Sequence, residues 1–238
     1  MSTSKIALVT GANKGIGKEI ARQLGGLGMT VLVAARDAGR VEAAARELRD
    51  EGMDARPVVL DVTDEESVAV VAKQVESEVG RLDVLVNNAG ILTEPDGVST
   101  EDFVRTFQTN VVGVVNVTNA LLPLLRKGSD ARVVNLSSEL GSVALLADPT
   151  SLQASIPFYA YNSSKAALNA VTVMFANAVR ADEIKVNAVS PGYCATDMTE
   201  HQGELTATQG ASIAVRFATL PADGPTAEFH GQEGALPW

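Results

Sequence analysis

A tyrosine and a lysine, Tyr161 and Lys165, are four residues apart within Ala160–Val179, where apolar residues recur at helical spacing. Side chains four residues apart on a helix lie on one face and can reach one ligand. The pKa of a free tyrosine is about 10, too high for efficient proton transfer near neutrality, and a nearby ammonium lowers it. The pair therefore predicts proton delivery to a developing alkoxide, with an inert surface pair as the alternative.

A serine is expected near this pair. Ser138 follows the fifth predicted strand and would lie at the carboxyl edge of a sheet, where ligands bind in open α/β folds. Its hydroxyl can hydrogen-bond a substrate oxygen there. Ser137 competes with Ser138 for this role, and Tyr159 competes with Tyr161. Because Tyr159 is six residues before Lys165, it falls on another face of the helix or ahead of it.

A glycine-rich turn, Thr10–Gly17, follows the first predicted strand and opens the first predicted helix. Glycines let the backbone approach a pyrophosphate, and a helix N-terminus offers unpaired N–H groups and partial positive charge. The spacing Gly-x3-Gly-x-Gly differs from the G-x-G-x-x-G fingerprint. ATP hydrolysis is disfavoured, because Glu19 stands where a P-loop needs Ser or Thr. A tight turn without a ligand is the alternative. The residues predicted to bind a cofactor here are Gly11, Asn13, Lys14, Gly15, Ile16 and Gly17.

Two cations favour NADP over NAD. In dinucleotide folds an acid at the end of the second strand binds the ribose hydroxyls, whereas an arginine accommodates a 2′-phosphate. Arg36 follows that predicted strand and can pair with a phosphate through its planar fork, and Lys14 adds a second positive charge. Asp37 could bind the ribose, but because it comes after Arg36 we expect it to face away. Two ordinary surface cations are the alternative.

The elements that must position these residues alternate between strand and helix. Short continuous apolar runs are typical of strands buried on both faces of a parallel sheet. This order predicts an α/β fold, a doubly wound, Rossmann-like, mostly parallel sheet flanked by helices, with residues 1–238 forming a single domain. The predicted strands are Ile6–Val9, Met29–Ala35, Val58–Leu60, Leu82–Val86, Arg132–Leu136 and Ile184–Val189. The predicted helices are Ile16–Leu27, Val41–Glu51, Glu65–Val79, Phe103–Leu125 and Ala160–Val179.

Composition and charge argue against several classes of protein. Apolar residues make up 46% of the chain and charged residues 20%, an ordinary globular balance. The formal net charge of −10 comes without a basic stripe, so nucleic-acid binding is not expected. We expect no membrane span and no signal peptide, which suits a cytoplasmic protein. The lone Cys194 cannot form an intrachain disulfide, and His201 and His230 lack ligand partners at useful spacing, so no metal is predicted.

Taken in order along the chain, these residues resemble the short-chain dehydrogenase/reductase family, and the resemblance covers almost the whole sequence. The Tyr-x3-Lys spacing alone is a weak signal, but the ordered set is specific. Within the family the chain is most similar to the NADPH-dependent carbonyl reductases, through Thr10–Gly17, Ala35–Asp37 and Leu220–Trp238. The ordered set is Gly11, Gly15, Gly17, Asp61, Asn87–Gly90, Asn110, Ser137-Ser138, Tyr161, Lys165 and Pro191-Gly192 with Thr196.

The resemblance implies a role for each position. Ser138, as the second serine of its pair, would be the catalytic one, and Asn110 would complete a water-linked proton relay to Lys165. The implied activity is hydride transfer from NADPH to the carbonyl carbon of an aldehyde or ketone, with Tyr161 as proton donor. The further cofactor-binding residues implied are Asp61 at the adenine amino group with Val62 beside it, Asn88, Ala89 and Gly90 along the central groove, and Pro191, Gly192 and Thr196 at the nicotinamide.

Two other functions stay open. One is an NADP-dependent alcohol dehydrogenase working in the oxidative direction, since direction depends on concentrations. The other is a regulator that binds NADP(H) without catalysis. The four filled catalytic positions argue against the regulator, although a fold and its motifs never prove turnover.

The chain departs from the family pattern in an insertion at about 142–157. In the monomeric carbonyl reductases a longer insertion at this place covers the helix face that other members use for dimerisation. The insertion here is shorter, so it leaves the oligomeric state open; we favour a monomer, with a homo-oligomer as the alternative. We expect the insertion to be irregular and the tail 221–238 to be loop-like, with one short strand around Glu228–His230. Trp238 either closes over the substrate cleft or docks on the core.

An apolar substrate cleft is expected beside the catalytic residues. Few polar groups in such a cleft suit a hydrophobic ketone or aldehyde. The predicted lining is Leu145, Leu146, Ile156 and Phe158 on one wall and Tyr193, Met198 and Leu205 on the other.

Overall fold

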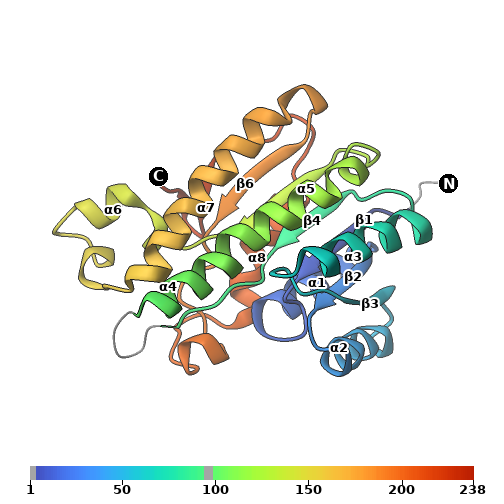
Figure 1. Ribbon diagram of the computed structural model, residues 1–238, viewed down its shortest axis with the longest axis horizontal. Helices are drawn as coiled ribbons and strands as arrows, with labels where there is room; N and C mark the ends of the chain where they lie inside the picture. The colour runs from blue at the N-terminus through green and yellow to red at the C-terminus, as the bar shows by residue number, and fades with distance from the viewer. Residues whose placement is uncertain (1–3, 94–98) are drawn as a thin grey trace.

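The computed structural model describes residues 4–93 and 99–238, which form a layered α/β structure (Figure 1). Within them, an eight-stranded sheet has the order β3-β2-β1-β4-β5-β6-β7-β8. Neighbouring strands are parallel except for β7 and β8. The strands are β1 (Ile6–Thr10), β2 (Thr30–Ala35), β3 (Ala55–Val59), β4 (Val84–Asn87), β5 (Arg132–Leu136), β6 (Lys185–Val189), β7 (Phe229–Gly231) and β8 (Gly234–Ala235).

Helices cover both faces of this sheet. One core cluster packs α1, α2 and α8 against the sheet, through residues such as Ile20, Val41 and Phe217. A second cluster packs α3, α5 and α7 against it, through residues such as Val68 and Leu121. Strands β1, β2, β4 and β5 are buried along their whole length, because each face has its own helical layer. The helices are α1 (Gly15–Gly26), α2 (Ala38–Asp50), α3 (Glu65–Glu78), α4 (Thr100–Phe107), α5 (Gly113–Leu125), α6 (Val143–Ala147), α7 (Tyr159–Ala178) and α8 (Ala207–Ala218).

The predicted doubly wound, mostly parallel sheet is confirmed. All six predicted strands are present, and β5 has the predicted bounds. Because β1 pairs with both β2 and β4, the strand order reverses there, and the carboxyl ends of β1 and β4 flank the crevice where open α/β folds bind ligands.

Two predictions about the elements were wrong, and one helix was missed. The single helix Phe103–Leu125 is divided by a π-helical turn, Gln108–Val112, which separates α4 from α5. The insertion is not irregular throughout, because it contains α6 and a 3₁₀ turn, Gln153–Ser155; Figure 1 shows it projecting at one end of the molecule beside α7. Helix α8 was not predicted at all, since small residues weaken its apolar pattern.

Candidate functional site

Helix α7 carries Tyr161 and Lys165 against the end of β5. The contact depends on Gly141, in the 3₁₀ turn Glu139–Gly141. A Cβ atom at Gly141 would lie 2.6 Å from the Cβ of Lys165 and 2.7 Å from its carbonyl carbon. The absence of a side chain at this position therefore lets the turn that follows Ser138 pack directly on the helix.

Ser138 and Tyr161 meet through this packing. Their side chains are hydrogen-bonded, and the Ser138 hydroxyl also accepts from the backbone N–H of Leu140 at 3.2 Å. Desolvation raises the pKa of Tyr161 to about 12, and the hydrogen bond with Ser138 opposes that rise. The tyrosine is therefore held in its protonated, donating form, beside a second hydroxyl that could share a substrate oxygen.

Lys165 lies beside Tyr161, but its ammonium is hydrogen-bonded to a backbone carbonyl of β5. Its ammonium donates to the carbonyl of Leu136 at 2.7 Å and is 5.5 Å from the centroid of the Tyr161 ring. Burial lowers the pKa of Lys165 to about 8. The expected net lowering of the Tyr161 pKa by this ammonium is not found in the protein alone, because desolvation of the hydroxyl dominates.

Asn110 lies in the π-helical turn and is fully buried. Its amide accepts from the backbone N–H of Ile91 at 2.8 Å and donates to Ile91 O and to Ser164 Oγ, each at 3.0 Å. A Cβ at Gly90 would be 3.3 Å from Asn110 Oδ1 and 3.6 Å from Lys165 Nζ. The asparagine and the lysine thus flank Gly90, and the water-linked relay stays a prediction.

The two competing residues have other roles. Ser137 is buried and donates to the side chain of Asn169 at 2.6 Å, and Asn169 in turn donates to Gly141 O. Tyr159 is 63% exposed on the outer side of α7. Ser138 and Tyr161, rather than these neighbours, are the residues that the fold brings together.

The glycine-rich turn has the backbone that a phosphate cradle needs. Gly11 and Gly15 have φ of +63° and +56°, and a Cβ at Gly17 would lie 2.3 Å from Asn88 Nδ2. Asn88 donates to the carbonyls of Thr10 and Gly11, which ties the turn to the end of β4. Within the described residues, α1 begins with no side-chain cap and no acid in its first turn. These features fit the diphosphate of a dinucleotide.

The other predicted residues of this turn lie on its surface side. Asn13 and Ile16 are half-buried, and Ile16 also packs against the core cluster under α1. Ala89, at the end of β4, donates its backbone N–H to Thr10 Oγ1 at 3.0 Å. The turn and the β4 end are thus one hydrogen-bonded unit.

The adenosine side of the crevice has the expected charges. Arg36 is exposed after β2. The pKa of Asp61 is held below its usual value mainly by hydrogen bonds from Thr63, and to a smaller extent by the positive charge of Arg36. Asp37 accepts from the backbone N–H of Arg40 at 2.9 Å and so caps α2. One oxygen of its carboxylate is thus engaged as a helix cap, and the expectation that Asp37 does not bind the ribose stays a prediction.

The loop after β6 closes over the glycine-rich turn. Gly192 has φ of +79°, and the loop is pinned by the hydrogen bond from Ala195 N to Leu205 O at 2.7 Å. A Cβ at Gly15 would lie 3.7 Å from the methyl group of Thr196. Thr196 therefore lies against the glycine-rich turn, and Pro191 and Gly192 belong to the same loop.

An ion pair between Lys14 and Asp197 joins these two segments, and sequence reasoning did not find it. The Lys14 ammonium and the Asp197 carboxylate are 2.6 Å apart. Lys14, predicted to contact a phosphate, is therefore paired with a carboxylate in the protein alone. Nothing in the spacing of two residues so far apart in the chain indicates the contact.

The insertion and the tail meet beyond the catalytic residues. Trp238 stacks on Phe229, with 5.6 Å between ring centroids, and its backbone oxygen accepts from Ala144 N at 3.0 Å. Trp238 is thus docked on β7 and α6, the second of the two expected outcomes. Gln153 Nε2 donates to Glu139 Oε2 at 2.9 Å, so the insertion is also tied to the turn after Ser138.

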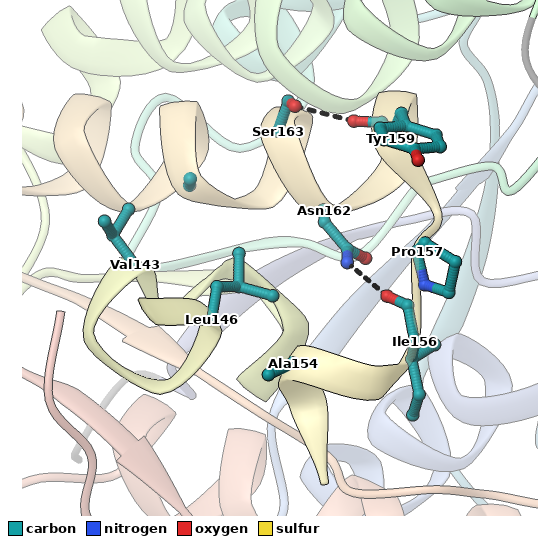
Figure 2. Close-up of a pocket in the computed structure, with 9 residues that line it drawn as sticks. Val143, Leu146, Ala154, Ile156, Pro157, Tyr159, Asn162 and Ser163 are labelled. Carbon is teal, nitrogen blue, oxygen red and sulfur yellow. Dashed lines mark hydrogen bonds between the residues drawn. The ribbon is translucent and has the colours of Figure 1, made fainter. Parts of the chain in front are cut away.

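Two of the four residues predicted for one cleft wall line a different groove. Leu146 and Ile156 line a groove of about 420 Å³ between the insertion and the outer face of α7, as Figure 2 shows, and neither Tyr161 nor Lys165 lines it. The insertion thus presents these two side chains to a different face of the helix from the catalytic one. Tyr193 and Met198 are exposed on the loop after β6.

Among the described residues, no group of three or more His, Cys, Asp or Glu side chains is placed to hold a metal ion. None of the helices in residues 4–93 and 99–238 has the length and hydropathy needed to cross a membrane.

A doubly wound sheet with a glycine-rich turn at its switch point and a Ser–Tyr–Lys cluster beside it defines a dinucleotide-dependent oxidoreductase. The model of the short chain dehydrogenase family matches residues 5–206. The chain belongs to the short-chain dehydrogenase/reductase family.

Three similar proteins cover nearly the whole chain. The short-chain dehydrogenase anuI of Penicillium roqueforti (strain FM164) is 37% identical, over 97% of this chain and 93% of its own length. Carbonyl reductase (NADPH) 3 of Mus musculus is 35% identical, over 97% and 96%. The crystal structure of NADPH-bound carbonyl reductase from chicken fatty liver superposes with a TM-score of 0.87, 27% identity and full coverage of both chains.

Proposed function

We propose that this protein is an NADPH-dependent carbonyl reductase. The observation that carries the proposal is the cluster of Ser138, Tyr161 and Lys165 at the carboxyl end of β5, next to the switch point of the sheet. Similarity to a carbonyl reductase named for NADPH and to an NADPH-bound structure supports the choice of cofactor and reaction. NADPH, when bound, supplies the hydride that reduces the carbonyl carbon.

The protein's own side chains act on the carbonyl oxygen. The hydroxyls of Ser138 and Tyr161 are already hydrogen-bonded to each other, so an oxygen placed between them meets two donors. Tyr161 gives up its proton as negative charge develops on that oxygen. The raised pKa keeps this proton in place until then. The Lys165 ammonium, 5.5 Å from the ring, stabilises the tyrosinate that remains.

Reprotonation of Tyr161 would run through the α7 side of the site. Lys165 and Asn110 flank Gly90, and Ser164 Oγ links Asn110 to the backbone oxygen of Tyr161 at 2.7 Å. These contacts hold the Asn110 side chain in place near Gly90, which Lys165 also approaches. They support the relay that the family resemblance implies.

The preference for NADPH over NADH rests on charge. Arg36 is exposed at the end of β2, where it can meet a 2′-phosphate, and the adjacent Asp37 already uses one carboxylate oxygen as a helix cap. Lys14 supplies a second cation once it leaves Asp197. We take the substrate to be a hydrophobic aldehyde or ketone and the protein to act as a monomer.

The test is a panel of aldehydes and ketones assayed by loss of NADPH absorbance, with NADH as the control. Turnover of apolar carbonyl compounds with NADPH, and much slower turnover with NADH, is the expected result. If no carbonyl compound is reduced but alcohols are oxidised with NADP, the oxidative alternative replaces the proposal. Binding of NADPH with no turnover in either direction would favour the regulator.

A further inference from the structure

A buried amide, Asn169, fastens helix α7 to the segment that carries Ser138. Tyr161, Lys165 and Asn169 follow one another along α7 at steps of four residues, so each lies about one helical turn beyond the last. Asn169 is 3% exposed, and its side chain forms two hydrogen bonds to residues on either side of Ser138 in the chain. The helix that carries the tyrosine and the lysine is therefore also bonded to the segment that carries the serine.

These two hydrogen bonds join the sheet to the turn after Ser138. Asn169 Oδ1 accepts from the hydroxyl of Ser137 at 2.6 Å, and the backbone N–H of Ser137 donates to Val189 O in β6 at 2.8 Å. Asn169 Nδ2 donates to the carbonyl of Gly141 at 3.1 Å. The amide thus uses its acceptor on a residue fixed in the sheet and its donor on the end of the turn. A carboxylate, which has no donor, or an apolar side chain cannot make both contacts.

The place of Ser138 depends on that turn. Ser138 precedes the 3₁₀ turn Glu139–Gly141, its hydroxyl accepts from Leu140 N at 3.2 Å, and its carbonyl accepts from Gly141 N at 2.8 Å. These bonds are internal, so the turn can move away from α7 as a unit without breaking them. The bond from Asn169 to Gly141 opposes such a movement, because it ties the far end of the turn to the helix.

We propose that Asn169 is a positioning residue for carbonyl reduction, which holds the turn after β5 against α7 so that the Ser138 hydroxyl stays beside Tyr161. The inference rests on the proposed function, because Asn169 acts on the reaction only through Ser138. A purely structural clamp would stabilise the fold without changing what the Ser138 hydroxyl contributes to turnover. Two measurements separate these roles.

The first measurement needs no turnover. Asn169→Leu keeps a side chain that branches at the same atom and removes both hydrogen bonds. Amide hydrogen exchange of the full chain, followed by NMR, should become at least about tenfold faster at Leu140, relative to the amides of β1, because its N–H is protected by Ser138 Oγ. Unchanged relative exchange at Leu140 would overturn the proposal.

Thr172→Val is the matched control. Thr172 lies on the same helix, is fully buried, and accepts from Asn135 Nδ2 at 2.8 Å, within β5 and not in the turn. The substitution is close to isosteric and removes a buried hydrogen bond between α7 and the sheet. It should leave the relative exchange at Leu140 unchanged. Equal acceleration in the two variants would show a general loosening of α7 and would overturn the proposal.

The second measurement is a double-mutant cycle on kcat with a ketone and NADPH. Ser138→Ala alone should lower kcat by about 100-fold, as expected for one donor to a developing oxyanion. Asn169→Leu should lower kcat by about 10- to 100-fold, and in that background Ser138→Ala should cost about threefold or less, since the hydroxyl is already misplaced. In the Thr172→Val background the loss should stay at about 100-fold. If Ser138→Ala costs the same in the parent and in Asn169→Leu, the two residues act independently and the proposal fails.

Ser137→Ala gives the same tests if Asn169→Leu does not fold, because it removes a single oxygen atom and leaves Asn169 Oδ1 without its donor. Faster relative exchange at Leu140 and a smaller loss from Ser138→Ala are again expected, and no change in either would overturn the proposal. A parent enzyme that reduces no carbonyl compound is a failure of the proposed function. The exchange measurement still decides whether Asn169 holds the turn, so the two failures are distinguished.

Discussion

Lys14 and Asp197 form an ion pair across the mouth of the dinucleotide crevice, with 2.6 Å between the ammonium nitrogen and a carboxylate oxygen. The pair links the glycine-rich turn to the loop that carries Thr196. Hydrogen bonding and charge from Lys14 hold the pKa of Asp197 below its usual value. If Lys14 contacts the 2′-phosphate of NADPH, as predicted, the phosphate must compete with this carboxylate, so we expect the pair to weaken NADPH binding.

Asp197→Asn should therefore tighten NADPH binding. Exposed ion pairs contribute little, so we expect a gain of about two- to fivefold, with a smaller change for NADH, which lacks the phosphate. Fluorescence titration of both cofactors measures it. Glu204→Gln, an equal charge change on the same loop, is the control. If the two variants behave alike, the effect is one of net charge and not of the pair.

Tyr161→Phe should lower kcat by at least about 100-fold, because the proton donor is lost while the ring and its packing remain. NADPH affinity should stay within about twofold of the parent enzyme. Tyr159→Phe removes an equivalent hydroxyl from an exposed position and should leave kcat unchanged. Steady-state kinetics on a ketone and a cofactor titration give both quantities. Retained turnover in Tyr161→Phe would exclude the mechanism.

Arg36→Asp should weaken NADPH binding by about 10- to 100-fold, the value of a hydrogen bond between charged groups, and should affect NADH much less. Arg46→Asp makes the same charge change at an exposed position on α2. It should alter both affinities only slightly. Equal losses of NADPH and NADH affinity in Arg36→Asp would refute the assignment of Arg36 to the 2′-phosphate.

Lys165 should make stability depend on pH. Burial lowers its pKa from 10.5 to about 8, so the folded protein carries the full cost of the buried charge below pH 8. Between pH 8 and 10.5 the unfolded chain binds more protons at this residue, and stability should rise. Urea unfolding should show that the stability of the parent, relative to Lys165→Met, is about 1–2 kcal/mol greater at pH 9.5 than at pH 7.5. A constant difference would contradict the lowered pKa.

Gly141→Ala should damage both stability and turnover. The new Cβ would lie 2.6 Å from the Cβ of Lys165, so the turn after Ser138 must move away from α7. Overpacking of this kind costs about 1–3 kcal/mol, and displacement of Ser138 should lower kcat. Gly26→Ala is the control, because its Cβ meets nothing within 4 Å. Unfolding curves and kcat for the two variants decide whether the close approach matters.

Much of the fold followed from local patterns. Continuous apolar runs mark strands buried on both faces, and this signal located β5 at its observed bounds and β1 to within one residue. The pattern failed at α8, where Gly210 and several alanines dilute the apolar face, and at the π-helical turn, which shifts the periodicity around Asn110 without any Pro or Gly to mark it.

The sequence by itself determined the fold class and the family, and it predicted the residues at the crevice, because strand burial, turn chemistry and the Tyr-x3-Lys spacing are properties of short segments. Only the tertiary structure decided what those residues meet. Desolvation at the packed end of β5 sets the pKa of Tyr161, and chain folding brings Lys14 to Asp197. The return of the insertion onto α7 leaves Asn162 with an unmet acceptor. Such contacts join distant segments, and no local pattern encodes them.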